Sequence, residues 1–346
     1  MGIVVIFAVI IFPLLILGSI RKDTCQSKYL IERQETNVIR GISAVFIIES
    51  HFCAWVQEMG ENANRVVEMI IGQLGGIGVL LFFFISGYGI YISYAEIEPS
   101  WRYLQKRLES VYIPYVFMKL IILFLFYMNG TKDSLFERIL KIIMLEDWFI
   151  RVIVLQYLTF FFLWKIVKLK KNKLLYGSLI VNCILSVIFV VEQRPSRWFN
   201  ALWLFIVGFV IAEYRKPVIE WFNEKYVVKC LFLFIGFLCS GILFAFFKSE
   251  VFWINIFKVI SGCFLVVLMC GILKIISLKS VVLEYIGKRS LYYYIVHLNV
   301  WESLKQIRNS EIKVVLAVLI TVIFSEILFF CYKRLKEMVN ELLYKR

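Results

Sequence analysis

The sequence predicts an all-α bundle of transmembrane helices, and three observations support that prediction. The chain has 346 residues, of which 61% are hydrophobic, and its mean hydropathy of +0.81 is above that of ordinary soluble domains. Its apolar stretches recur at lengths of about twenty residues, which is what a helix needs to cross a bilayer. The Lys and Arg residues gather between these stretches, where they indicate topology.

About eleven spanning helices are expected, a ten-helix core preceded by one extra N-terminal helix. Residues 2–20 form the extra helix, because Arg21 and Lys22 follow the apolar stretch and a signal peptide has the reverse order. We therefore expect two units, the extra helix with its loop at 1–35 and a membrane domain at 36–346. The core spans are expected at 38–57, 74–95, 111–129, 148–167, 176–191, 198–214, 228–247, 254–277, 290–304 and 313–332.

The distribution of basic residues predicts the orientation of the chain in the membrane. If the 21–37 loop is cytoplasmic, the Arg215–Lys216 pair, the Lys288–Arg289 pair and the basic C-terminal tail all fall on the same side. We therefore expect a multi-pass protein of the plasma or inner membrane, surrounded by lipid, with its N-terminus outside and its C-terminus in the cytoplasm. Residues 130–147 are then an amphipathic helix on the outer surface.

The composition also excludes several classes of function. The net charge of +14 does not indicate nucleic-acid binding, because the basic residues form short segments between apolar runs. The eight cysteines show no paired short spacing, and all but Cys25 lie in or at the ends of apolar runs, so neither a disulfide frame nor a metal site is predicted. With no long hydrophilic segment, any chemistry must occur in the bundle or at its mouths.

The 38–57 span carries the most informative residues, Arg40, Glu49 and His51. Eleven steps along an α-helix place Arg40 and His51 on one face, about 16–17 Å apart along the axis, or half a bilayer. Glu49 lies on the face opposite Arg40, so this helix should lie in the centre of the bundle or line a wet cavity. Because ionisable groups are expensive at membrane depth, we interpret them as functional. The alternatives are an interfacial arginine that sets topology, a packed structural histidine and a structural glutamate.

The next span opens with closely spaced glycines at 75–78 and is interrupted by Ser86-Gly87 near mid-membrane. Glycines at such positions let another backbone approach closely, and packing alone explains them. The Ser86 hydroxyl is placed to bond a neighbour or a substrate. It is not expected to be a nucleophile, because spacing assigns it no histidine–carboxylate relay.

These motifs resemble the paired signature of the acyltransferase-3 family of integral membrane acyltransferases. Arg40 and His51, with ten residues between them, are followed by Gly-x-x-Gly-Val-x-x-Phe-Phe-x-Ile-Ser-Gly-Tyr at 75–88. Supporting matches continue to about residue 335 and comprise Lys106-Arg107-Leu108 before Tyr112-Ile113-Pro114-Tyr115, Trp148-Phe149, and Gly287-Lys-Arg-Ser290-Leu-Tyr-Tyr-Tyr-Ile-Val-His297. The chain departs from the family pattern in three ways. Ser110 or Val111 replaces a second basic residue before Pro114, an extra N-terminal span is present, and an extracytoplasmic hydrolase-like domain is missing.

The resemblance implies transfer of an acyl group, often acetyl, from cytoplasmic acyl-coenzyme A to a hydroxyl of a cell-envelope or secreted glycan or glycolipid. Acyl-coenzyme A is then a donor substrate, no bound cofactor is implied, and a separate glycan-assembly protein is a candidate partner. Such polysaccharide O-acetylation would be an enzymatic function. The alternatives are a transporter or flippase of a small polar or glycolipid substrate, and a non-catalytic membrane scaffold.

A division of roles follows if the predicted topology is combined with this resemblance. Arg40 lies near the cytoplasmic end, where its planar guanidinium can clamp coenzyme A phosphates in bidentate fashion. His51 lies beyond the midplane, where it either deprotonates the acceptor hydroxyl or briefly carries the acyl group. The predicted catalytic residues are His51, Arg40 and Glu49. The predicted substrate-binding residues are Arg40, Ser86, Tyr88, Arg107, Trp148 and His297.

Overall fold

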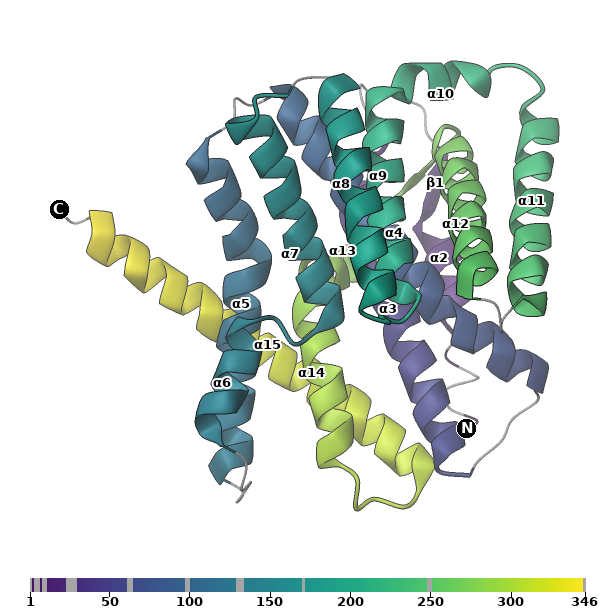
Figure 1. The fold of residues 1–346 in the computed structure, drawn as a ribbon. Helices are drawn as coiled ribbons and strands as arrows, with labels where there is room; N and C mark the ends of the chain where they lie inside the picture. Colours follow the sequence, from purple (N-terminus) through teal and green to yellow (C-terminus); the bar gives the residue numbers. More distant parts are fainter. Residues whose placement is uncertain are drawn as a thin grey trace.

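The protein is a helical bundle in the computed structural model, which describes residues 2, 7, 11–22, 30–60, 65–96, 100–128, 134–169, 172–247 and 251–344 (Figure 1). Within this part of the chain, eight helices are long and apolar enough to cross a membrane. The predicted all-α transmembrane bundle is therefore confirmed. The chain is a multi-pass membrane protein.

The eight long helices run in both directions through the bundle (Figure 1). They are α3 (Arg33–Glu58), α4 (Arg65–Glu96), α5 (Trp101–Met128), α7 (Trp148–Phe161) with its π-helical continuation η2 (Phe162–Ile166), α8 (Asn172–Val191), α11 (Tyr226–Phe246), α12 (Val251–Leu273) and α15 (Ser310–Tyr344). Two more predicted spans, α9 (Arg197–Glu213) and α14 (Ser290–Ser303), are shorter but largely buried. The remaining helices are α2 (Phe12–Ser19), α6 (Leu135–Ile143), α10 (Arg215–Trp221) and α13 (Val281–Lys288).

Several helices extend beyond the apolar runs that predict them. Helix α5 begins at Trp101, ahead of the expected start at 111, and α15 continues to Tyr344. These extensions are rich in Arg, Lys and Glu, which favour helix and need no lipid. The predicted surface helix at 130–147 is the shorter α6, capped by the Ser134 hydroxyl. Part of the 21–37 loop, including Cys25, lies outside the described residues.

A short two-stranded sheet joins the start of the chain to a distant segment. Strand β1 (Ile20–Lys22) pairs antiparallel with β2 (Ile276–Leu278), with Ile20 opposite Leu278. The Glu35 carboxylate in α3 accepts a hydrogen bond from the Leu278 amide at 3.2 Å. The sheet and α3 therefore meet at the end of α3 that carries Arg40.

Glycines allow two close helix contacts in the core. In α4, a Cβ on Gly87 would collide with the Phe205 carbonyl of α9, and in α9 a Cβ on Gly208 would collide with the Phe84 carbonyl of α4. The same reciprocal contact joins α3 to α13 through Gly41 and Gly287. At Gly87 the structure supports the packing interpretation of the glycines in this span.

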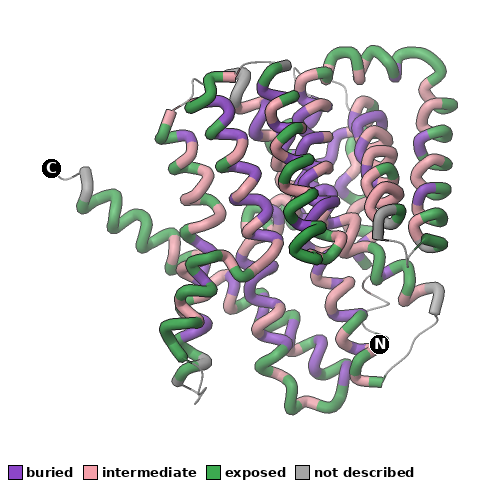
Figure 2. Tube along the Cα trace, in the orientation of Figure 1, coloured by how far each residue is buried: buried purple, intermediate pink, exposed green. Residues whose placement is uncertain are grey.

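Helix α3 lies inside the bundle rather than on its surface (Figure 2). Of its most apolar stretch, 56% is buried, compared with 11% for α11. Helix α3 packs against α4, α13 and α14. Its charged and ionisable side chains therefore face protein on several sides, as two polar faces on one helix predict.

Candidate functional site

The two histidines of the chain form a pair, although 246 positions separate them. His51 Nδ1 on α3 lies 2.8 Å from His297 Nε2 on α14. The ring planes differ by 8° and the ring centroids are 5.1 Å apart. With the nitrogens so much closer than the centroids, the rings meet edge to edge in nearly one plane, which is the geometry of a directed hydrogen bond.

Aromatic side chains surround the histidine pair. Trp55 lies against His51 with ring centroids 5.5 Å apart, and it stacks on Trp301 at 5.0 Å. Phe52 contacts both His297 and Trp301. His51 on α3 contacts His297 on α14, and one turn further along both helices Trp55 contacts Trp301. The two helices therefore run parallel here. The aromatic rings restrict rotation of both imidazoles, and His297 is fully buried.

Helix α14 is held in place on two further sides by consecutive tyrosines. The Tyr294 hydroxyl donates to the Asp147 carboxylate at 3.1 Å, at the start of α7. The Tyr293 hydroxyl donates to Glu326 of α15 at 2.8 Å, and Arg289 forms an ion pair with the same carboxylate at 2.9 Å. These contacts position His297 from α7 and α15 at once.

Asp147 is an unusual carboxylate at this end of the bundle. Burial raises the pKa of its carboxyl group above the ordinary value, and the nearby Lys119 ammonium acts in the opposite direction. Asp147 also caps α7 by accepting a hydrogen bond from the Phe149 amide at 3.2 Å. Asp147 therefore links the start of α7 to α14 and to the histidine pair.

Arg40 lies three turns from His51 along α3, toward the end that contacts α13. Its guanidinium contacts the Asn37 side chain at 3.4 Å. In the described part of the chain, no carboxylate forms an ion pair with it. The Arg107 side chain, on α5, donates to the Ser93 hydroxyl at 3.1 Å, and its charge acts on Arg40. Arg40 and Arg107 thus form a cationic region at this depth.

The other predicted site residues are placed in different surroundings. Glu49 is buried, and its Oε2 has no hydrogen-bond partner among the described residues. The Tyr88 hydroxyl accepts a hydrogen bond from the Ile31 amide at 3.2 Å, so it ties α4 to the segment before α3. Ser86 is only partly buried, on the same helix. The structure thus joins His51 and His297 directly and keeps Arg40, Glu49 and Tyr88 apart from them.

Trp148 belongs to a cluster of tryptophan and arginine at the end of the bundle that holds Asp147. The Arg197 guanidinium lies 5.5 Å from the Trp148 ring centroid, and Trp148 lies 6.5 Å from Trp198. Arg151 and Arg194 lie over Trp198 at 5.7 and 5.1 Å. The charge of Arg197 also acts on His51. This end of the site is therefore cationic as well.

Sequence reasoning missed Lys258, a partly buried lysine on α12. Its Nζ lies 3.8 Å from the position that a Cβ on Gly76 would occupy, and no carboxylate in the described residues forms an ion pair with it. A lysine near the start of the apolar run 254–277, sixteen residues before Lys274 at its other end, was the available signal. Trp55, Trp301 and Asp147 gave no such signal, because their roles arise from contacts between helices distant in sequence.

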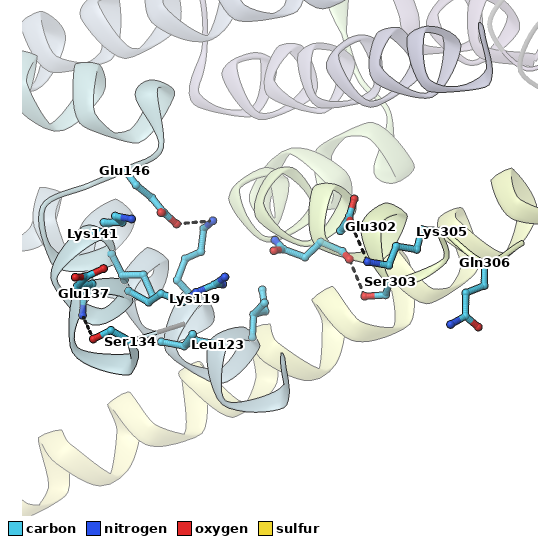
Figure 3. Close-up of a pocket in the computed structure, with 14 residues that line it drawn as sticks. Lys119, Leu123, Ser134, Glu137, Lys141, Glu146, Glu302, Ser303, Lys305 and Gln306 are labelled. Atoms are coloured by element: carbon cyan, nitrogen blue, oxygen red, sulfur yellow. Dashed lines mark hydrogen bonds and ion pairs between the residues drawn. The ribbon is translucent and has the colours of Figure 1, made fainter. Parts of the chain in front are cut away.

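A cavity of about 970 Å³ opens between α5, α6 and α14 (Figure 3). Two ion pairs lie in its wall, Lys119 with Glu146 at 3.2 Å and Lys305 with Glu302 at 3.6 Å. Its other polar lining residues are Ser134, Glu137, Arg138, Lys141, Asn299, Ser303 and Gln306. It lies toward the His51 end of the bundle, because Asn299 and Ser303 follow His297 on α14, although neither histidine lines it.

Comparison with known proteins identifies the family. The acyltransferase-3 family model, described as an acyltransferase domain, matches residues 33–331. No curated protein and no solved structure shows a significant match. The matched region runs from the first turn of α3 into α15 and contains both histidines, Arg40, Arg107 and Trp148. The chain therefore belongs to the acyltransferase-3 family and is a membrane acyltransferase.

Proposed function

We propose that this protein transfers an acyl group, by preference acetyl, from cytoplasmic acyl-coenzyme A to a hydroxyl of a cell-envelope or secreted glycan. The observation that carries the proposal is the arrangement on α3. A partly buried histidine pair lies at one depth, and an arginine without an acidic partner in the described residues lies three turns away. One helix thus presents a proton-transfer group and an anion-binding group to opposite halves of the bundle.

The Arg40 end suits the donor. Coenzyme A carries several phosphates, and a guanidinium binds phosphate through two parallel hydrogen bonds. Arg40 has no carboxylate in the described residues to neutralise it, and Arg107 adds a second positive charge nearby. An anionic donor group would relieve the repulsion between the two guanidiniums. In the predicted topology this end faces the cytoplasm, where acyl-coenzyme A is made.

The His51 end suits the acceptor. An imidazole can take the proton of a hydroxyl or carry the acyl group itself, and both routes start at the same ring. The cavity at this end is lined by hydroxyl, amide and charged side chains, which together provide the donors and acceptors that bind sugars. In this proposal the cavity holds a part of the glycan beyond the reacting sugar.

The direct test supplies radiolabelled acetyl-coenzyme A to inside-out membrane vesicles that contain the wild-type protein or His51→Ala, together with the glycans of the producing cell. We expect alkali-labile acetyl label in the glycan or glycolipid fraction with the wild type only. Free coenzyme A should appear in equal amount. Vesicles that move the glycan without covalent labelling would instead support a transporter and would overturn this proposal.

The cavity gives a second, independent test of the acceptor side. Lys141→Ala should raise the acceptor KM and leave the donor KM unchanged, because the side chain lies in the cavity and far from Arg40. The control is Lys106→Ala, which removes one positive charge from an exposed lysine at the other end of the bundle. Equal acceptor KM values in Lys141→Ala and the wild type would remove the cavity from the acceptor path.

A further inference from the structure

We propose that His297 is a positioning residue that fixes the tautomer of His51, so that Nε2 of His51 is the atom that reacts. This inference deepens the proposed function and rests on it for the chemistry, but not for the tautomer. It starts from a carbonyl group. His297 Nδ1 lies 3.0 Å from the Tyr293 carbonyl oxygen, and a carbonyl can only accept. His297 Nδ1 must therefore carry a proton and donate it.

The remaining assignments follow from the proton count of a neutral imidazole. A neutral ring has one N–H group, so His297 Nε2 is unprotonated and accepts. Its partner at 2.8 Å is His51 Nδ1, which must then be the donor. The proton of His51 is thereby placed on Nδ1. Its Nε2 keeps a free lone pair, as a general base or nucleophile requires.

The opposite arrangement would need a charged His297. If His297 carried two protons, its Nε2 would donate to His51 Nδ1 and force the His51 proton onto Nε2. The His297 side chain is fully buried among Phe52, Trp55 and Tyr294, and no carboxylate in the described residues hydrogen-bonds to it. An unpaired buried cation is costly, so the neutral form is favoured and with it the reactive tautomer of His51.

The surrounding contacts hold this relay in one geometry. The carbonyl that orients His297 belongs to Tyr293, whose hydroxyl is bound by Glu326 of α15. Trp55 lies against His51 and stacks on Trp301, so neither imidazole can turn without displacing large rings. The chain of hydrogen bonds thus runs from α15 through α14 to α3. It ends at the lone pair of His51 Nε2.

In direct transfer, the acceptor oxygen forms a bond to the acyl carbon as its hydroxyl proton moves to His51 Nε2. The bond between the acyl carbon and sulfur breaks, and its electron pair stays on sulfur. The positive charge on the His51 ring is stabilised, because its Nδ1–H then donates a charge-assisted hydrogen bond to His297 Nε2. The proton next moves from His51 to the coenzyme A thiolate, which leaves as the thiol. In the acyl-carrier route, the same Nε2 lone pair attacks the acyl carbon, and the C–S bond breaks with its electron pair on sulfur. The acceptor oxygen then bonds to the acyl carbon, the N–C bond breaks with its electron pair on Nε2, and the hydroxyl proton passes to the thiolate.

The tautomer can be tested without any activity measurement. The chain contains only two histidines, so ring ¹⁵N NMR of the full-length protein in lipid vesicles shows these two rings alone. We expect both rings as the neutral form protonated at Nδ1. In His297→Leu, the His51 signals should show a mixture of tautomers. A His51 ring protonated at Nε2 in the wild type would overturn the inference, whether or not the protein transfers acetyl groups.

Activity measurements on matched amide variants separate positioning from packing. A glutamine at 297 is long enough to place its amide oxygen near the position of Nε2, whereas an asparagine is too short. We therefore expect His297→Asn and His297→Leu to lower kcat by about 10–100-fold with unchanged donor KM, and His297→Gln to recover most of the loss. If the wild type is active and His297→Leu has the same kcat, the role of His297 is overturned. An inactive wild type would overturn the proposed function, while the NMR experiment would still test the tautomer.

Discussion

His51 and His297 form a hydrogen bond with each other among aromatic side chains that offer few other hydrogen-bond partners. Each imidazole has one donor and one acceptor, and both are expensive to leave unpaired away from water. Their hydrogen bond at 2.8 Å uses one nitrogen of each ring, and Tyr293 uses the second nitrogen of His297. Only one ring nitrogen of the pair, Nε2 of His51, lacks a protein partner in the described residues. The pair is therefore built around a single open position.

His51→Ala should lower the rate of acyl transfer by about 10²–10⁴-fold, because proton transfer by a positioned side chain contributes about that much. Expression and membrane insertion should remain near normal, since the removed ring leaves only a small cavity. The purified variant is assayed with acetyl-coenzyme A and glycan in vesicles. Ser50→Ala is the control, because the Ser50 hydroxyl donates to the Gly72 carbonyl at 2.9 Å and points toward α4. Wild-type turnover in His51→Ala would contradict the proposed role.

Arg40→Ala should raise the donor KM by about 10–100-fold, the equivalent of about 1.5–3 kcal/mol for hydrogen bonds to a charged group. Arg40→Lys should restore only part of this loss, because lysine lacks the planar fork that binds two phosphate oxygens. The acceptor KM should not change in either variant. Acetyl-coenzyme A saturation curves measure the effect, and an unchanged donor KM in Arg40→Ala would remove Arg40 from the donor site.

Among the helices, α14 does the most to assemble the site, although its 14 residues are few for a helix that spans a membrane. Three successive tyrosines contact two neighbouring helices. Tyr292 packs on Phe329 of α15, Tyr293 bonds Glu326 of α15, and Tyr294 bonds Asp147 at the start of α7. With His297 facing α3, one helix contacts three others through four side chains. Loss of any one bond should loosen α14.

Tyr294→Phe should destabilise the fold by about 1–3 kcal/mol, because it leaves the partly buried Asp147 carboxyl without its hydroxyl donor. Tyr292→Phe is the matched control, since it removes a hydroxyl that has no hydrogen-bond partner in the described residues. The midpoint of thermal unfolding in detergent should fall for Tyr294→Phe and stay close to the wild type for Tyr292→Phe. Equal midpoints would show that the bond to Asp147 contributes nothing.

At the scale of elements, the sequence predicts most of the bundle but not its contacts. Apolar length identifies the spans, because a bilayer demands about twenty apolar residues whatever the neighbours are. It cannot locate helix ends such as Trp101 or Tyr344, since polar helix continues outside lipid. Strands β1 and β2 have three residues each, too few to show alternation. The histidine pair was equally hidden, because 246 positions lie between partners that only packing brings together.

The whole molecule has two ends that carry candidate site residues, and α3 runs from the Arg40 end to the His51 end. The Arg40 end holds the β1–β2 sheet, α13 and the start of α5. The His51 end holds α6, the start of α7 and the cavity. In Figure 1, α10 and α6 lie at these opposite ends. The proposed transfer requires that a thioester from one side meet a hydroxyl from the other near His51.

The assignment of donor and acceptor depends on the orientation of the chain in the membrane. Single cysteines in a cysteine-free background report sidedness when intact cells are treated with a membrane-impermeant thiol reagent. We choose Ser196→Cys, in the turn before α9, and Glu220→Cys, in the exposed helix α10 at the other end. The distribution of Lys and Arg predicts that Ser196→Cys labels at once and Glu220→Cys only after the cells are opened. The reverse pattern would place Arg40 on the side that lacks coenzyme A, and the donor would then have to enter beside His51.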